Sequence, residues 1–346
     1  MKIIVAFDSF KGCLSSAEAN EAAAEGILSL FPDAEVIQVP VSDGGEGFLD
    51  AVKASVSTVV TKTVASHDAY RRPILTDYLI QGKTAVIEVA RIIGLPLVAD
   101  LEPDIMQATS YGVGEVLADA VASGCREFII GLGGTATCDF GEGMIDGAGW
   151  KVTGDRWRVT GASDVTSPLL GKNGAARLFA PQKGATPEQV ELLEQKAQWI
   201  VKQNSEAIHR DCSMLPGAGA AGGLGYALMQ YLDADIRSGA DVLFDLCHFS
   251  EMLDDADLVI TGEGRSDRQT LLGKLPCAIL RQAQKWNIAT WLMAGQIADT
   301  PKLLEAGFEE VVCFNPSGLP LSEAMKPSVA RKNIRTTVRR LLTLNA

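Results

Sequence analysis

The chain has 346 residues, of which 47% are hydrophobic and 21% are charged, a composition typical of globular proteins. Because one hydrophobic core rarely grows to this length, we expect two domains. The formal net charge of −12 disfavours nucleic acids and anionic membranes as partners, and it favours a small-molecule ligand.

The cysteines and the start of the chain bear on its location. The seven cysteines stand singly, without a Cys-x-x-Cys pair, which disfavours a disulfide framework or a zinc cage. The apolar run after Met1-Lys2 is too short for a signal peptide, and no segment is long enough to span a bilayer. We expect a cytoplasmic protein.

The first elements expected are a strand, a helix and a second strand. Residues 3–7 form a continuous apolar run, typical of a strand buried on both faces. Ser15 followed by Glu18 predicts a helix that begins with a capping box and ends before Pro32. Residues 35–39 read as the second strand.

The middle of the chain has a different pattern. Residues 58–64 and 75–91 alternate between apolar and polar side chains, with a turn signal at Gly82, and this predicts antiparallel hairpins. Thr186 with Gln189 predicts the start of a long helix. We therefore expect an inserted α/β domain with a mixed sheet at residues 61–238.

The C-terminal part returns to alternating strands and helices. The predicted elements are, in order, a strand at 258–261, a helix at 276–286, a strand at 289–294, a helix at 301–306 and a strand at 310–314. Alternation of this kind predicts a doubly wound parallel sheet. Residues 1–60 and 239–346 would together form this discontinuous domain, with the active site in the cleft between the two domains.

Five stretches combine glycine with acidic residues or stand where a strand should end: residues 8–12, 43–47, 131–143, 216–225 and 262–267. Glycine allows a backbone to approach a ligand closely, and carboxylates hold a hard cation or accept a proton. Together they predict a phosphorylated ligand and a divalent metal.

Asp8, Ser9 and Lys11 lie between a predicted strand and a predicted helix, where an anion is favoured. Lys11 suits phosphate or carboxylate. The alternative is a helix-capping aspartate beside a solvated lysine. For residues 43–47 the alternative is a turn whose two acids cap the next helix.

The stretch at 131–143 offers backbone N–H groups and the hydroxyls of Thr135 and Thr137 to phosphate oxygens, and Asp139 to metal or substrate. Residues 217–222 match the Rossmann glycine pattern, but Pro216 precedes them and no clear strand leads in. We therefore interpret them as a flexible nest that touches substrate or phosphate, and we disfavour a dinucleotide-dependent dehydrogenase.

Residues 262–267 place an acid, an arginine and a second acid at a strand end, spaced by two glycines. Phosphoryl transfer needs a cation, a metal ligand and a base, and this loop could supply all three. The alternative is a surface ion pair between Arg265 and Asp267. The sequence contains no Walker motif, and its three histidines lie outside these stretches.

In their order, these motifs resemble the bacterial glycerate kinase family of type I, which is glycerate 2-kinase-like. The matching stretches are residues 8–12, 43–47, 109–114, 181–185, 216–225 and 257–267. The resemblance implies phosphorylation of D-glycerate with ATP and magnesium, with the 2-phosphate as the expected product. It also implies a flavodoxin-like domain with a restriction-enzyme-like domain inserted.

Some positions depart from the family pattern. Cys138 and Phe140 stand where the family has asparagine and glycine, Ser167 replaces another asparagine, and the stretch between Trp150 and Ser163 is shortened. The loss of two amides near a polar ligand could retune substrate choice.

The predicted roles follow. The catalytic residues are Asp267, Arg265, Lys11 and Asp8; the substrate- or phosphate-binding residues are Ser9, Gly44, Gly45, Gly133, Gly134, Thr135, Thr137, Lys183, Gly217, Gly219 and Gly222; the metal ligands are Asp43, Glu263 and Asp139. One of the two cations, Lys11 or Arg265, would neutralise the substrate carboxylate and the other the transferring phosphoryl group, and which does which stays open. Asp267 is the first candidate for the base and Asp8 the second.

Two other functions stay open: a kinase for another small hydroxy acid, and a non-catalytic paralogue that binds a sugar acid. The sequence also leaves open whether the 2- or the 3-hydroxyl is phosphorylated, which loop binds adenine and whether the chain forms a homo-oligomer.

Overall fold

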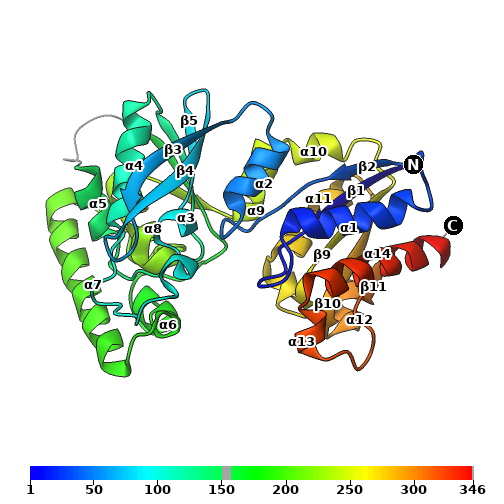
Figure 1. Cartoon of the computed structure of the whole chain (residues 1–346). Coiled ribbons are helices and arrows are strands. Elements are labelled where there is room, and N and C mark those ends of the chain that lie inside the picture. Colours follow the sequence, from blue (N-terminus) through cyan, green and yellow to red (C-terminus); the bar gives the residue numbers. More distant parts are fainter. Residues whose placement is uncertain (150–156, 345–346) are drawn as a thin grey trace. The chain divides into compact units, whose positions relative to one another are not determined.

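The computed structural model describes residues 1–149 and 157–344, and the chain divides into two compact units (Figure 1). Unit 1 comprises Met1–Ser42, Asp50–Ser57 and Ala240–Ala346, and unit 2 comprises Asp43–Leu49 and Thr58–Gly239. The chain therefore passes from unit 1 to unit 2 and returns twice, first through the short segment at residues 43–49 and then through residues 58–239.

Unit 1 is built on a sheet of five parallel strands in the order β2-β1-β9-β10-β11. These strands are β1 (Lys2–Phe7), β2 (Glu35–Gln38), β9 (Leu258–Ser266), β10 (Ala289–Ile297) and β11 (Glu310–Cys313). This is the flavodoxin-like order, in which the chain winds one way from the first strand and then the other. The predicted fold class is confirmed. The direction of winding reverses between β1 and β9.

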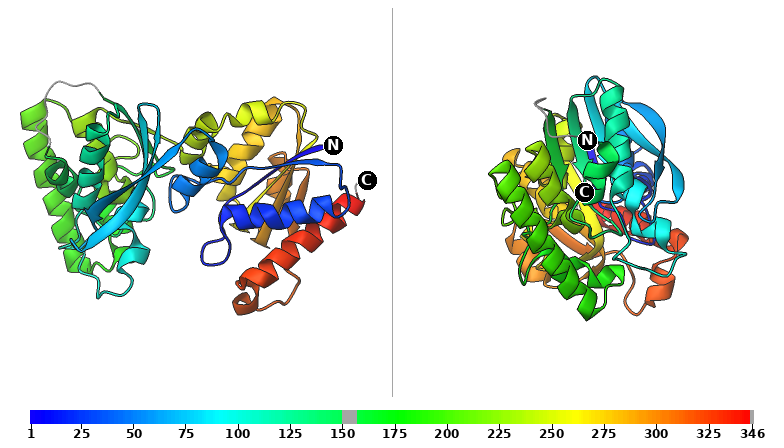
Figure 2. Two further views of the ribbon diagram at one scale, coloured as in Figure 1. Left: turned by 45° about the horizontal axis from the view of Figure 1, so that its top comes forward. Right: turned by 90° about the vertical axis from the view of Figure 1, so that its left-hand side faces the viewer.

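Helices cover both faces of this sheet (Figure 2). The helices that lie wholly or mostly in unit 1 are α1 (Ser16–Leu28), α2 (Phe48–Ser55), α9 (Gly239–Leu246), α10 (Phe249–Met252), α11 (Leu275–Lys285), α12 (Thr300–Glu305), α13 (Leu321–Ala324) and α14 (Pro327–Leu344), with the 3-10 helix η3 (Thr270–Leu272). On one face Val5 and Met293 pack with residues of α1 and α14, and on the other Leu292 packs with α11 and α12. The capping box of Ser15 and Glu18 is confirmed.

Strands β9 and β10 are longer than predicted. Residues 262–266 were expected in a loop, but they continue β9, because Arg265 pairs in parallel register with Gln296, and Ser266 with Ile297. Glycine has little intrinsic preference for strands, yet a partner strand that extends equally far supplies the hydrogen bonds that hold Gly262 and Gly264 extended.

Unit 2 contains a six-stranded mixed sheet in the order β3-β4-β5-β6-β7-β8. The strands are β3 (Val60–His67), β4 (Pro73–Gln81), β5 (Thr84–Glu88), β6 (Glu127–Gly131), β7 (Arg158–Ala162) and β8 (Asp235–Arg237). Pairing from β3 to β5 is antiparallel, which confirms the predicted hairpins, and pairing from β5 to β8 is parallel. The carboxyl ends of the last four strands therefore lie along one edge.

The helices of unit 2 are α3 (Ala90–Ile93), α4 (Tyr111–Ala122), α5 (Glu142–Ala148), α6 (Ala175–Phe179), α7 (Pro187–Ile208) and α8 (Ala220–Leu232), with the 3-10 helices η1 (Leu95–Val98) and η2 (Pro181–Lys183). The predicted capping box of Thr186 and Gln189 opens α7. Helix α8 starts irregularly, because Ala221, Gly222 and Gly223 all have positive φ. Regular helix follows from Leu224.

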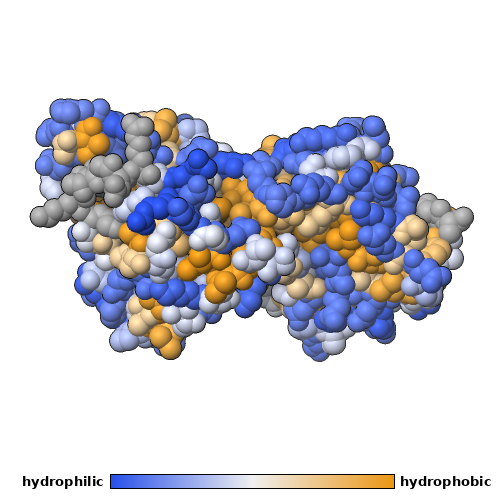
Figure 3. Space-filling model, turned by 90° about the horizontal axis from the view of Figure 1, so that it is seen from above, coloured by the Kyte–Doolittle hydropathy of each residue, from blue (hydrophilic) through white to orange (hydrophobic). Residues whose placement is uncertain are grey.

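Hydrophilic and hydrophobic residues are interspersed over the face of the molecule in Figure 3. The exposed apolar side chains include Trp199 and Leu192 on α7 and Leu272 on η3. Among the residues that the structure describes, none of the helices has the length and apolar character needed to cross a membrane.

Gly114 offers a test of the packing between α4 and α5. Helix propensity alone favours alanine over glycine by roughly 1 kcal/mol. However, a Cβ on Gly114 would lie 2.1 Å from the carbonyl oxygen of Met144 in α5. We expect Gly114→Ala to lower the free energy of unfolding by roughly 1–3 kcal/mol, measured by chemical denaturation.

The control is Ala118→Gly in the same helix, where a partly exposed side chain is removed. It should cost only the intrinsic difference of about 1 kcal/mol. A Gly114→Ala variant at least as stable as the wild type would show that α4 and α5 do not pack this closely.

Candidate functional site

The carboxyl ends of β1 and β9 bring several predicted residues together in unit 1. The backbone N–H of Asp8 donates to the carbonyl oxygen of Gly262 at 2.8 Å, and the Ser9 N–H donates to Asp8 Oδ1 at 2.7 Å. The loop closes where the Phe10 N–H donates to the Leu14 carbonyl. In doubly wound sheets, ligands bind beyond the strand ends where the winding reverses, which is this position.

Arg265 and Asp267 lie at the end of β9 and form an ion pair. This pair is the alternative to a catalytic role for the two residues that the sequence analysis considered. Arg265 Nε is 3.4 Å from Asp267 Oδ2, with the arginine side chain 63% exposed and the aspartate 17%. Asp267 Oδ1 also accepts the Gln269 N–H at 2.8 Å, which fixes the turn into η3. The exposed guanidinium keeps N–H groups available for an anion.

Glu263 is a buried carboxylate in the same strand. The hydroxyls of Thr270 and Ser266 donate to its Oε1 at 2.6 and 3.1 Å, and Lys274 Nζ is 3.4 Å from its Oε2. Sequence analysis missed Thr270 and Lys274. The available signal was their position directly after residues 262–267, in the stretch Gln269-Thr270-Leu271-Leu272-Gly273-Lys274.

In unit 2, two of the predicted glycine loops pack backbone against backbone at the carboxyl edge of β5 to β8. The Gly133 N–H donates to the Gly44 carbonyl at 3.1 Å. A Cβ on Gly44, whose φ is +90°, would lie 2.4 Å from the carbonyl oxygen of Ala162. A Cβ on Gly133 would lie 2.3 Å from the Gly45 Cα. At these positions glycine is required by neighbouring backbone.

Glu88, at the end of β5, holds the segment at residues 43–49 and was not predicted. This acid is 2% exposed. Its Oε2 accepts the Leu49 N–H at 2.9 Å and its Oε1 accepts the Gly47 N–H at 3.2 Å. Arg91 Nε lies 3.5 Å from the same carboxylate. Glu88 therefore ties the Asp43 loop to the sheet of unit 2.

The Asp139 carboxylate accepts five hydrogen bonds from the protein, four of them at Oδ2. Its Oδ2 accepts the Ser110 N–H at 2.7 Å, the Ser110 hydroxyl at 2.9 Å, and the Thr109 hydroxyl and the Gly143 N–H at 3.2 Å each. Its Oδ1 accepts the Gly141 N–H at 3.2 Å. A carboxylate with these partners joins the start of α4 to the start of α5, and it has little capacity left for a metal.

Lys183 is 6% exposed, so it supports the 131–143 loop from within the protein. Its Nζ donates to the Thr137 carbonyl at 2.7 Å and to the Thr135 hydroxyl at 3.0 Å. Burial lowers the pKa of Lys183 to about 8, while Cys138 and Asp139 act in the opposite direction. The Thr137 hydroxyl, predicted to face phosphate, is buried without a protein partner among the described residues.

Gly217, Gly219 and Gly222 pack closely against protein atoms. A Cβ on Gly219 would lie 2.5 Å from the Pro168 carbonyl oxygen, and one on Gly222, with φ +66°, would lie 2.0 Å from the Thr137 carbonyl oxygen. Gly217 has φ +89° and lies against Ile236. The stretch predicted to be a flexible nest is therefore packed against the 131–143 loop.

The departures from the family pattern lie in packed surroundings. Cys138 and Phe140 are each 1% exposed and belong to one hydrophobic cluster with residues of α6 and α7. Burial raises the pKa of the Cys138 thiol to about 11. Ser167 accepts the Gly219 N–H through its carbonyl. Of the shortened stretch between Trp150 and Ser163, residues 150–156 lie outside the described residues.

Asp43 has the most accessible geometry for magnesium among the three predicted carboxylates. Its Oδ1 accepts the Gly45 N–H at 3.0 Å, and within the described ranges no protein group forms a hydrogen bond or an ion pair with its Oδ2. The same ranges contain no group of three or more metal-ligating side chains. One carboxylate fits magnesium, which is usually held by one or two carboxylates with substrate phosphates and water.

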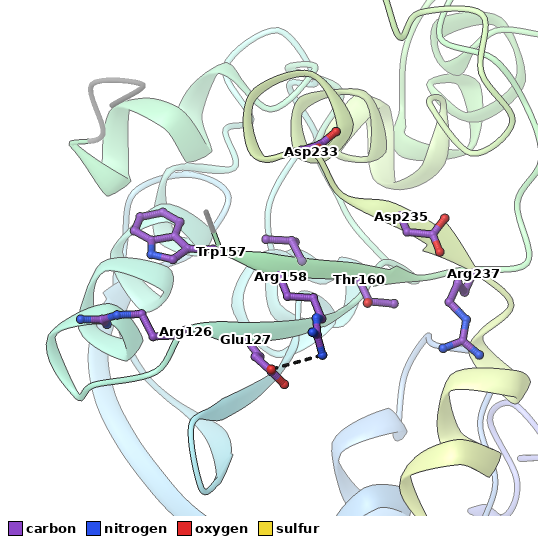
Figure 4. Close-up of a pocket in the computed structure, with 9 residues that line it drawn as sticks. Arg126, Glu127, Trp157, Arg158, Thr160, Asp233, Asp235 and Arg237 are labelled. Atoms are coloured by element: carbon purple, nitrogen blue, oxygen red, sulfur yellow. Dashed lines mark ion pairs between the residues drawn. The ribbon is translucent and has the colours of Figure 1, made fainter. Parts of the chain in front are cut away.

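A hollow lies at the edge of the unit 2 sheet opposite to the glycine loops, at the amino ends of β6, β7 and β8 (Figure 4). Its lining alternates in charge, with Arg158 3.3 Å from Glu127 and with Asp235 and Arg237 nearby. None of the predicted site residues lines it. The candidate residues form two clusters instead, one at the strand ends of each unit.

Comparison with known proteins identifies the family. The model of the glycerate kinase family matches residues 3–158 and 153–346. The chain belongs to the glycerate kinase family. A glycerate kinase of Bacillus subtilis strain 168 is 35% identical, with 94% of this chain and 93% of that protein covered. A glycerate 2-kinase of Escherichia coli K12 is 34% identical, with 98% of both covered.

Structural comparison agrees. A crystal structure of a candidate glycerate kinase 2 from Salmonella typhimurium LT2 matches with a TM-score of 0.83 at 33% identity, covering 100% of this chain and 98% of that one. The two-unit α/β fold is therefore a fold found in solved structures of this family. The predicted family and enzyme class are confirmed: the protein is a phosphotransferase of the glycerate kinase family.

Lys183 provides a pH-dependent test of the unit 2 cluster. Because its pKa is about 8 in the folded protein and about 10.4 in an unfolded chain, the unfolded state holds the proton over the interval between these values. The free energy of unfolding should therefore rise with pH across this interval.

The measurement is the difference between the wild type and Lys183→Met in denaturant titrations at several pH values, since groups far from Lys183 titrate equally in both proteins. The difference should grow in favour of the wild type between about pH 8 and 10.4. A difference that does not change with pH would mean that folding does not lower the pKa of Lys183.

Proposed function

We propose that this protein transfers the γ-phosphoryl group of ATP to a hydroxyl of D-glycerate, giving 2-phosphoglycerate. One observation supports this most directly: the loop at residues 8–12 lies beside the last part of β9 at the reversal point of a flavodoxin-like sheet. Such a position binds small ligands, and the relatives named glycerate kinase and glycerate 2-kinase indicate which ones.

The proposed anion contacts of unit 1 are Lys11 and Arg265. Both side chains are exposed, so neither needs to leave a buried partner to reach a ligand. Arginine presents a planar fork that matches a carboxylate, whereas lysine presents a compact point charge that suits a phosphoryl oxygen. We therefore assign Arg265 to the glycerate carboxylate and Lys11 to the transferring phosphoryl group.

The proposed base is an aspartate at the ends of β1 and β9. Phosphoryl transfer to a hydroxyl is assisted by a carboxylate that accepts the hydroxyl proton late in the reaction. Asp267 accepts the Gln269 N–H and pairs with Arg265, and these two contacts fix its orientation. Asp8 is the second candidate, since its Oδ1 is fixed by the Ser9 N–H at the end of β1.

We propose Asp43 as the carboxylate that holds magnesium together with the phosphates of ATP. Bound there, the ion would neutralise negative charge on the phosphates during transfer. Asp139 and Glu263 lose their predicted place as ligands in this proposal, because their oxygens already accept hydrogen bonds from Ser110 and Thr270, among others.

The proposal predicts ADP release from ATP and magnesium with D-glycerate. A panel of small hydroxy acids serves as the comparison, and ³¹P spectra of the product report the position of the phosphate. A 2-phosphate gives a doublet, because phosphorus couples to the single proton on C2, and a 3-phosphate gives a triplet. Turnover of another acid but not of glycerate would show that this other acid is the substrate. Binding of a sugar acid without ATP-dependent turnover would favour a sensor.

The two aspartates are separated by Asp267→Asn and Asp8→Asn, which keep the shape of the side chain and remove the proton acceptor. Loss of the base should lower kcat roughly 10²- to 10⁴-fold and leave the KM for ATP nearly unchanged. We expect this for Asp267→Asn. If Asp8→Asn shows the loss and Asp267→Asn does not, Asp8 is the base; if neither does, both assignments fail.

A further inference from the structure

Glu263 and Lys274 form a connected pair at the end of β9. Glu263 is 7% exposed, although it carries a charge. A buried carboxylate is tolerated only when its oxygens are hydrogen-bonded and its charge is balanced. Here two hydroxyls, from Thr270 and Ser266, donate to Oε1, and the ammonium group of Lys274 lies 3.4 Å from Oε2.

This pair fixes the direction of an otherwise exposed lysine. The Lys274 side chain is 43% exposed, so only part of it is covered by the protein. An ammonium group has three N–H donors, and one contact with Glu263 leaves the others available. Free lysine side chains sample many rotamers, and the buried carboxylate restricts this one before any ligand binds.

The surroundings of Lys274 suit a phosphate. Gly273, with φ +111°, turns the chain so that Lys274 immediately precedes the eleven-residue helix α11. Strand β9, which carries Glu263, is also the strand that adjoins β1 at the reversal point of the sheet. A lysine in this place adds a full positive charge beside the backbone where an anionic ligand is expected.

We propose that Lys274 binds the phosphate oxygens of ATP and that Glu263 is the residue that positions it. This inference rests on the proposed function, and it adds a phosphate contact to the exposed cations already assigned. It also explains why Glu263 is acidic without being a metal ligand: the carboxylate balances and directs the lysine.

The first test compares Lys274→Met with Lys285→Met. Both lysines are exposed and lie at the two ends of the same helix, α11, but among the described residues the Lys285 ammonium group hydrogen-bonds only to the Gln282 side chain. Loss of a hydrogen bond to a charged group should raise the Kd for magnesium-ATP, measured by calorimetry, roughly 10- to 100-fold for Lys274→Met. Lys285→Met should match the wild type. Thermal melts of both variants check that the fold is retained.

The second test is a double-mutant cycle between Glu263 and Lys274, read out as kcat/KM for ATP. Glu263→Gln keeps an oxygen that accepts the two hydroxyl bonds and removes the charge. If Glu263 acts through Lys274, Glu263→Gln should lower kcat/KM for ATP roughly 10- to 100-fold alone, but cause little further loss in a Lys274→Met background. A metal ligand would behave differently: its loss would add fully to that of Lys274 and raise the magnesium concentration required.

Binding and turnover separate this inference from the proposed function. A wild type that binds magnesium-ATP but does not phosphorylate D-glycerate refutes the substrate and leaves the Lys274 test intact. A Lys274→Met variant whose Kd for magnesium-ATP stays within about threefold of the wild type overturns the inference, whichever acid is the substrate. A wild type that binds no magnesium-ATP overturns both.

Discussion

The close approach of backbone segments at the carboxyl ends of strands is the constraint on which the candidate site depends. In unit 2 the loops at residues 43–47, 131–143 and 217–223 leave no room for side chains at Gly44, Gly133 and Gly222. Their glycines therefore shape the loops by packing, and the buried polar groups Glu88, Asp139 and Lys183 then hold these loops in place. In the proposed function, the chemistry is assigned to side chains that stay at least partly exposed, such as Asp43 and Arg265.

Much of the fold could be predicted because its signals are local. The apolar run in β1, the capping boxes at Ser15 and Thr186 and the turn at Gly82 each act within a few residues. The length of β9 was not predictable in this way. Gly262 and Gly264 favour a loop, and they are extended because β10 pairs with them as far as Ile297, a partner distant in sequence.

The candidate site was predictable by position and less so by role. Two of the glycine motifs start where a strand ends, residues 8–12 at β1 and residues 131–143 at β6, whereas residues 262–266 lie inside β9. A motif, however, does not say what an acid contacts. Asp139 accepts hydrogen bonds from the starts of two helices, and Lys183, which looked available for phosphate, is enclosed by the loop that it supports. These roles depend on tertiary contacts that spacing does not encode.

The difference between Glu263 and Asp43 shows how burial separates acids that look alike in sequence. In the sequence, both stand beside glycines a few residues after an apolar run. Glu263 is enclosed by Ser266, Thr270 and Lys274, so its charge is committed to neighbours within the protein. Asp43 is partly exposed, and its Oδ2 has no partner within residues 1–149 and 157–344, so its charge remains available to an external cation. In a phosphotransferase that handles anionic substrates, an acid paired with a lysine acts on the anion through the position of that lysine, whereas an exposed acid repels anions unless a cation lies between them.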